Sequence, residues 1–140
     1  MKKILVDSNV ILDILTEDLN WFSWSAEQLE RLSEQHLFVI NPIIYAEVSV
    51  RFSKIEELED ALPSDYFLRE ALPWEAAFLA GKAFVQYKKQ GGIRQSTMPD
   101  FYIGAHALVK DMVMLTRDLN RYQGYFPKLQ LITPDTDVKS

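Results

Sequence analysis

Four acidic residues in this sequence could act together: Asp7, Glu47, Asp100 and Asp118. Carboxylates gathered in one cleft can move protons or bind a hard divalent cation through oxygen. Without a cation, several like charges in a half-buried cleft repel one another strongly. Mg²⁺ and Mn²⁺ prefer oxygen ligands, so the predicted cofactor is one of these two ions.

Asp7 follows the stretch that organises the chain. Ile4, Leu5 and Val6 form a short apolar run, as expected for a strand buried on both faces of a parallel sheet. The run ends at Asp7, and a helical apolar pattern resumes over residues 10–15. An acid at the carboxyl end of a buried strand lies where open α/β sheets hold their ligands.

Further strands and helices alternate along the chain. Apolar runs predict strands at residues 37–40, 67–70, 112–115 and 129–132, with 67–70 as an edge strand. Helical patterns cover residues 22–34, 43–51, 54–61, 74–90 and 99–110. This alternation predicts a three-layer α/β/α domain with a parallel sheet of four or five strands.

The predicted topology places all four acids on one edge of that sheet. Asp7 and Asp118 follow strands, whereas Glu47 and Asp100 lie in the early turns of helices. Helix amino ends and strand carboxyl ends share one edge in such a fold. We therefore predict a metal site formed by all four acids.

Each acid also has a purely structural explanation. Asp7 could end its strand, and Asp118 could cap the turn after the fourth strand. Glu47 could pair with Arg51 on the helix surface, and Asp100 could favour the helix dipole. Only the conjunction of four acids on one edge favours a site.

Other candidate groups are weaker. His106 is predicted to face away from Asp100 and to pack within its helix, and His36 to lie in a turn at the opposite edge. Asp13 is predicted to be solvated or locally bonded. The aromatic cluster is predicted to be core or interface: Trp21, Phe22 and Trp24.

Length and composition indicate an ordinary globular protein. The 140 residues are expected to form one domain over residues 1–133, followed by a polar tail at 134–140. The absence of cysteine excludes disulfides and cysteine catalysis and suits the cytoplasm. No apolar stretch approaches the roughly 20 residues of a membrane span. The net charge of −5 disfavours tight, salt-driven binding of nucleic acid, although metal can offset clustered acids.

The chain resembles PIN-domain proteins, in particular VapC-type toxin ribonucleases. The resemblance runs in order from Ile4 to about Ile132, and four stretches carry it: residues 4–13 (ILVDSNVILD), 41–48 (NPIIYAEV), 99–107 (PDFYIGAHA) and 115–118 (LTRD). It implies that Asp7, Glu47, Asp100 and Asp118 bind the metal, with Asn9 and Thr116 supporting the site through hydrogen bonds.

The resemblance further implies a metal-dependent endoribonuclease. The partners it implies are an RNA substrate, a second copy of the chain and a VapB-type antitoxin whose arginine would compete with metal. Apolar residues at 21–24 and 42–52 are consistent with such interfaces. Arg117, Arg121, Lys88, Lys89 and Arg94 could contact phosphates or could be ordinary solvated charges.

Two other classes of protein remain open from sequence. A phosphohydrolase with an aspartyl nucleophile also begins with a strand and an aspartate, but it typically has a second aspartate where this chain has Asn9. A catalytically silent PIN-like module that binds RNA or protein is the other alternative.

Overall fold

Five parallel strands form the centre of the protein. The computed structural model describes residues 2–134. The strand order is β3-β2-β1-β4-β5. The strands are β1 (Lys2–Val6), β2 (His36–Ile40), β3 (Phe67–Arg69), β4 (Val113–Leu115) and β5 (Leu131–Ile132).

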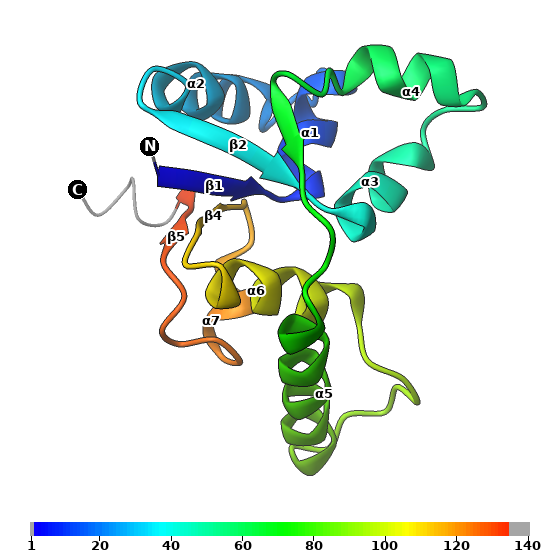
Figure 1. Ribbon diagram of the computed structural model, residues 1–140, viewed down its shortest axis with the longest axis vertical. Coiled ribbons are helices and arrows are strands. Elements are labelled where there is room, and N and C mark those ends of the chain that lie inside the picture. Colours follow the sequence, from blue (N-terminus) through cyan, green and yellow to red (C-terminus); the bar gives the residue numbers. More distant parts are fainter. Residues whose placement is uncertain (1, 135–140) are drawn as a thin grey trace.

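Helices cover both faces of the sheet, so the predicted three-layer α/β/α fold with a parallel sheet is confirmed. Figure 1 shows α1 and α2 on one side of the strands and α6 and α7 on the other, while α5 extends away from the sheet. The helices are α1 (Ser8–Leu15), α2 (Phe22–Leu32), α3 (Pro42–Ser49), α4 (Ile55–Ala61), α5 (Trp74–Lys89), α6 (Pro99–Val109) and α7 (Leu119–Gln123). None of the helices in residues 2–134 combines the length and apolar character needed to cross a bilayer.

The first strand lies in the middle of the sheet. β1 pairs with β2 on one side and with β4 on the other, and Ile4, Leu5 and Val6 are buried. The chain therefore builds the sheet outward in one direction through β2 and β3, and then in the other through β4 and β5. The carboxyl ends of β1 and β4 meet where this direction reverses, which is the usual ligand position in open α/β sheets.

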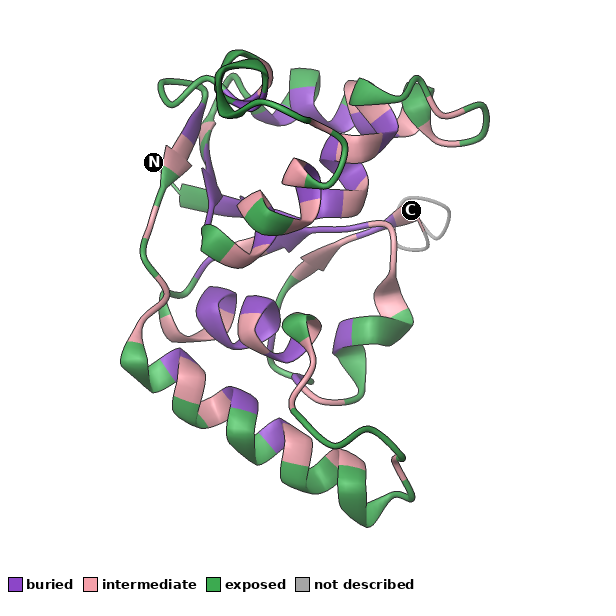
Figure 2. Cartoon of the chain, turned by 90° about the vertical axis from the view of Figure 1, so that its right-hand side faces the viewer, coloured by how far each residue is buried: buried purple, intermediate pink, exposed green. Residues whose placement is uncertain are grey.

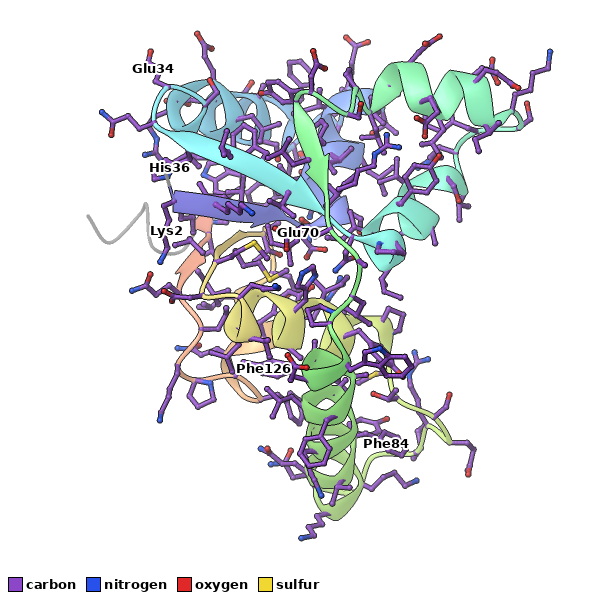
Figure 3. All side chains as sticks on the ribbon, in the orientation of Figure 1. Lys2, Glu34, His36, Glu70, Phe84 and Phe126 are labelled. Carbon is purple, nitrogen blue, oxygen red and sulfur yellow. The ribbon has the colours of Figure 1, made fainter. Side chains whose placement is uncertain are left out.

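The first residue of β2 differs from its prediction. His36 was expected in a turn, but it is the first residue of β2, paired in register with Lys2. Figure 3 shows both residues at the end of the sheet where β1 and β2 begin, away from Glu70. The apolar run at residues 37–40 predicts the strand, but its first residue is a polar histidine that this run does not include. Residues 135–140 of the predicted tail lie outside the described part of the chain.

Helix α6 is the most enclosed helix on its side of the sheet. Figure 2 shows the buried residues concentrated in the strands and in α6, whereas α5 is largely exposed on its outer side. On α6, Phe101, Ile103, Ala105 and Ala107 belong to the core. The amino end of this buried helix carries Asp100, so packing of the core fixes where this carboxylate lies.

Gly104 lets α6 approach the segment that contains α7. A Cβ atom at this position would lie 2.7 Å from the ring of Phe126 and 3.1 Å from the ring of Tyr122. Gly104→Ala is therefore expected to lower the free energy of unfolding by about 1–3 kcal/mol through overpacking. Urea denaturation measures this change.

Gly81→Ala provides the matched control for this substitution. Nothing lies within 4 Å of the Cβ that it adds to α5. Because alanine favours the helix over glycine, this variant should gain up to about 1 kcal/mol. Equal stability changes for both variants would contradict the packing explanation.

Candidate active site at the carboxyl edge of the sheet

Asp7 is fully buried at the junction of β1 and α1. Its Oδ1 atom accepts a hydrogen bond from the Ser8 backbone N–H at 2.8 Å, which caps α1. Its Oδ2 atom accepts hydrogen bonds from the Thr116 hydroxyl at 2.8 Å, the Tyr122 hydroxyl at 3.0 Å and the Asn9 amide at 3.4 Å. Burial raises the pKa of Asp7, and the hydrogen bonds from Thr116, Tyr122 and Ser8 oppose this rise.

Glu47 points from α3 toward the same edge. Asn41 caps this helix by accepting a hydrogen bond from Ile44 N–H, and Pro42 begins it, as the sequence predicts. The Ser8 hydroxyl donates to Glu47 Oε1 at 2.8 Å. Within residues 2–134, Glu47 forms no ion pair with Arg51, so the surface-pair explanation is wrong. Burial raises the pKa of Glu47, the Ser8 hydrogen bond lowers it, and the nearby charge of Asp7 raises it.

Asp100 and Asp118 are held by a shared arginine. Arg121 Nε lies 3.3 Å from Asp100 Oδ2 and 3.1 Å from Asp118 Oδ2. Burial raises the pKa of Asp100 to about 6; Arg121 opposes this rise, whereas the charges of Asp7, Glu47 and Asp118 add to it. Arg121 therefore links Asp100 to Asp118, as Ser8 links Asp7 to Glu47.

Asp118 also has the structural role proposed for it. Its Oδ1 atom accepts a hydrogen bond from Arg121 N–H at 3.2 Å and so caps α7. The capping contact uses one carboxylate oxygen, and the Arg121 side chain contacts the other.

Asn9 and Thr116 connect the ends of the two central strands. The Asn9 amide donates to Thr116 Oγ1 at 3.3 Å, and Asn9 Oδ1 accepts from Arg117 N–H at 3.3 Å. Thr116 Oγ1 also accepts a hydrogen bond from Asp118 N–H at 3.1 Å. These contacts tie the Asp118 segment to the Asp7 segment, although the two are far apart in sequence.

Sequence reasoning overlooked two residues that contact these acids. Ser8 bonds to Glu47, and Tyr122 bonds to Asp7. The pattern that follows Asp118 gives no signal for Tyr122, because its contact depends on how the five-residue helix α7 packs beside α6. Arg121 was predicted to contact phosphates or to be an ordinary solvated charge, whereas it contacts Asp100 and Asp118 directly.

Asp13 and Arg117 form a half-buried ion pair outside this group. Arg117 Nε and Nη2 lie 2.7 and 3.0 Å from the two carboxylate oxygens of Asp13, and Ser25 Oγ donates to Asp13 at 2.8 Å. The prediction of a solvated or locally bonded Asp13 is therefore wrong. The Arg117 guanidinium also lies 5.3 Å from the centre of the Trp21 ring, so it is committed to structural contacts.

His106 is a packed helix residue, as predicted. It is fully buried; its Nδ1 atom lies 3.0 Å from Asn41 Nδ2, and its Nε2 atom lies 3.2 Å from Glu70 Oε1. Asn41 Oδ1 is already bonded to Ile44 N–H, so its amide donates to a neutral imidazole that carries its proton on Nε2. The contact links the start of α3 to α6, the two helices that carry Glu47 and Asp100.

Protonation of His106 should be costly in the folded state. Burial lowers the pKa of His106 from 6.5, and Glu70 opposes this change. A folded-state pKa below the unfolded value gives stability that is present above about pH 6.5 and is lost as the pH falls below it. We expect His106→Gln to reduce this acid-side loss.

Denaturation of the parent and the His106→Gln variant between pH 7.5 and 5 measures this contribution. The raised pKa of Asp100 changes stability in the opposite direction, but it is common to both proteins, so the difference between the two curves isolates the histidine. Parallel curves would show that His106 titrates normally.

The four acids provide the donors that a hard cation prefers. All are carboxylates, and their mutual repulsion raises the cost of ionising Asp100. Within residues 2–134, however, no three His, Cys, Asp or Glu residues come close enough together to hold a metal ion. The ligand types fit Mg²⁺ or Mn²⁺. In this arrangement the acids are too far apart to share an ion, so metal binding requires them to move closer together and requires Arg121 to leave Asp100 and Asp118.

The sequence matches the family model described as the PIN domain over residues 4–125. This chain belongs to the PIN-domain family. PIN-domain proteins are generally nucleases that depend on divalent metals. Membership removes the phosphohydrolase alternative and agrees with the acids at the carboxyl edge. Among curated proteins, no sequence match was found.

The PIN fold of this chain is similar to that of several solved structures. VapBC2 from Rickettsia felis, bound to a DNA fragment from its promoter, matches with a TM-score of 0.72 and 17% identity, over 94% of this chain and 98% of that chain. VapBC-1 from nontypeable Haemophilus influenzae matches with a TM-score of 0.71 and 23% identity, over 94% and 97%. A toxin–antitoxin complex from Klebsiella pneumoniae matches with a TM-score of 0.68 and 21% identity, over 94% and 97%.

Proposed function

We propose that this PIN domain is a metal-dependent endoribonuclease and the toxin of a type II toxin–antitoxin pair that acts in the cytoplasm. The observation that carries the proposal is a pair of bridges at the sheet edge: Ser8 contacts both Asp7 and Glu47, and Arg121 contacts both Asp100 and Asp118. A structural role for each acid separately does not explain why the four are joined in pairs by Ser8 and Arg121.

In this proposal, Asp7, Glu47, Asp100 and Asp118 hold one or two Mg²⁺ or Mn²⁺ ions. The bound metal would stabilise negative charge on the phosphate and increase the acidity of the attacking water. Thr116 and Tyr122 orient Asp7, and Ser8 orients Glu47. Hydrolysis adds water across the phosphodiester, so a P–O bond forms as the bond to the leaving sugar oxygen breaks.

Incubation of the purified protein with structured RNA tests the proposed activity. Cleavage should require Mg²⁺ or Mn²⁺ and should stop in EDTA. The same RNA sequence made as DNA provides the substrate control. An absence of cleavage with both metals would reject the enzyme.

The antitoxin is proposed to bind an apolar cavity beside α1. VapBC names recur among the structures with this fold, and one of them is described as a toxin–antitoxin complex. In this chain, a cavity of about 710 Å³ lies between α1, α2 and the segment that leads into β3. Its lining includes Ile11, Ile14, Leu15, Leu29, Tyr66 and Phe67. An apolar segment of an antitoxin would bury this surface, and a basic residue beside that segment would compete for the acids.

Substitution at the cavity wall distinguishes this surface from the acidic edge. Leu15 lines the cavity and is 38% exposed, so Leu15→Glu should weaken inhibition by an antitoxin without altering metal binding. Leu19→Glu is the control, because Leu19 is fully exposed and does not line the cavity. Equal inhibition of both variants would argue against the cavity as the binding surface.

We propose that a homodimer forms through α5, a different surface from the segments 21–24 and 42–52 predicted from sequence, which stay untested. Trp24 packs against the core, and Trp21 lies under Arg117. Trp74, Phe78 and Val85 are exposed on α5 at spacings that share one helix face. Light scattering at micromolar concentration should show a dimer, and Phe78→Glu should shift it to monomer. A monomeric parent would reject this interface.

The silent PIN-like module remains the second candidate because Arg121 contacts two of the acids. A protein whose acids serve only to hold this arginine would bind RNA or protein without turnover. The RNA assay separates the two candidates: a silent module would retain RNA in a binding assay but leave it uncut at all metal concentrations.

A further inference from the structure

Arg121 carries a positive charge into the group of acids. Its Nε atom lies 3.3 Å from Asp100 Oδ2 and 3.1 Å from Asp118 Oδ2, so one N–H group faces two carboxylates. The charge of Asp7 also acts on this guanidinium. The residue therefore offsets the repulsion that four carboxylates would otherwise experience.

The same contacts occupy oxygen atoms that a metal would need. Asp118 Oδ1 caps α7, and Asp118 Oδ2 faces Arg121. Asp100 Oδ2 also faces the arginine. A divalent ion that binds these two carboxylates meets the positive charge of Arg121, whose Nε lies 3.3 and 3.1 Å from their oxygens, and like charges at such distances repel strongly.

The Arg121 side chain is free to leave, whereas a neighbouring arginine is not. Arg121 is 40% exposed, and its partners Asp100 and Asp118 are 22% and 37% exposed. Arg117, four residues earlier, is bonded at two positions to Asp13, which is only 3% exposed. Rotation of Arg121 into solvent breaks partly exposed ion pairs, which are individually weak.

We propose that Arg121 is the resident cation of the metal-free site, and that a divalent ion must displace it from Asp100 and Asp118 in order to bind. This inference rests on the metal site in the proposed function. Either Arg121 or a divalent ion then contacts Asp100 and Asp118. This competition raises the metal concentration that is needed to fill the site.

Calorimetric titration of the metal-free protein with Mg²⁺ or Mn²⁺ tests the competition. Arg121→Gln should bind the ion on the order of three- to tenfold more tightly than the parent, because two weak ion pairs no longer need to be broken. Arg121→Lys keeps the positive charge but replaces the planar guanidinium with an ammonium group, so the increase in metal affinity should be smaller. Arg31→Gln is the control: it removes one exposed positive charge and the contact with Gln28 on α2, away from the acids, and should leave the affinity unchanged.

Thermal denaturation gives a second measurement on the same proteins. Without metal, Arg121→Gln should melt at a lower temperature than the parent, because the acids lose their cation. Saturating Mg²⁺ should raise its melting temperature more than that of the parent, since a ligand that binds only the folded state stabilises it according to its affinity.

Nitrogen-15 NMR of the arginine Nε–H groups follows the displacement in the unmodified protein and does not depend on whether a variant folds. The Arg121 signal should move toward the position of a solvated arginine as Mg²⁺ is added, while the Arg117 signal, bonded to Asp13, should remain.

The outcomes separate this inference from the proposed function. Metal binding by the parent with equal or weaker affinity in Arg121→Gln, or an unmoved Arg121 signal at saturation, would overturn the competition but leave the metal site intact. Failure of both parent and variant to bind either ion would overturn the metal site and the inference together.

Discussion

Asp100→Asn is expected to lower the rate of RNA cleavage by more than about 100-fold and to leave the fold intact. The amide keeps the shape of the side chain but loses the negative charge that would help hold the metal. Even the outer partners of metal ligands typically change affinity or activity by about 10–100-fold when they are replaced, so a direct ligand should have a larger effect. Cleavage of a labelled RNA in Mg²⁺ and in Mn²⁺ measures the loss.

Stability distinguishes this role of Asp100 from a structural one. Its pKa is raised from 3.8 to about 6 in the folded protein, so the folded state favours the protonated form. Above about pH 6, ionised Asp100 therefore destabilises the metal-free fold, and the penalty disappears as the pH falls. At pH 7 the metal-free Asp100→Asn variant should melt no lower than the parent, and Mg²⁺ should raise its melting temperature less. If Asp100 only stabilised the helix dipole, the variant would melt lower and retain activity.

Asp111→Asn is a matched control for this substitution. Asp111 lies just beyond α6, its side chain is 97% exposed, and it pairs with Lys2. Its backbone has a φ of 53°, a conformation that asparagine also tolerates. This variant should cleave RNA like the parent. Parental activity in Asp100→Asn as well would show that the four-acid site is incorrect.

Arg117→Met is expected to lower the free energy of unfolding by about 3 kcal/mol. The substitution removes the two hydrogen bonds that the guanidinium donates to the Asp13 carboxylate, which is only 3% exposed. Methionine keeps an apolar side chain of similar length beside Trp21. The decrease in the free energy of unfolding should therefore be mainly electrostatic. Urea denaturation at pH 7 measures the change.

The double variant Asp13→Leu/Arg117→Met tests whether the unpaired charge of Asp13 causes this loss of stability. Replacing both members of a buried ion pair with apolar groups removes the unpaired charge, so stability should partly return. Arg31→Met, on the exposed face of α2, should change stability by less than about 0.5 kcal/mol. A double variant that is less stable than Arg117→Met would mean that packing, rather than charge, determines the loss.

Sequence patterns predicted the fold because the central elements have strong local signals. The buried run Ile4–Val6 and the capped helix after Asn41 form as expected. The convergence of the acids followed from topology alone, since parallel strands and their helices share one edge. His36 was misassigned because it is a single polar residue that precedes the apolar run at residues 37–40.

The contacts around the acids were much less accessible from sequence. Tyr122 reaches Asp7 only because Gly104 lets α7 pack closely beside α6. Asp13 and Arg117 are 104 residues apart, and no local pattern indicates that they pair. Side-chain partners of this kind depend on tertiary packing, whereas strand order and helix ends depend on short stretches of chain.

The central position of β1 determines when the protein can become active during its own synthesis. β1 pairs with β4, and the Thr116 hydroxyl that bonds Asp7 lies 109 residues farther along the chain. At about 5–20 residues per second, a ribosome needs roughly 5–20 s to make this stretch. Throughout that interval the nascent chain carries Asp7 but lacks the strand and helix that complete its surroundings. The proposed acidic site therefore cannot form on a nascent chain until β4 and the Thr116 segment beyond it have been synthesised.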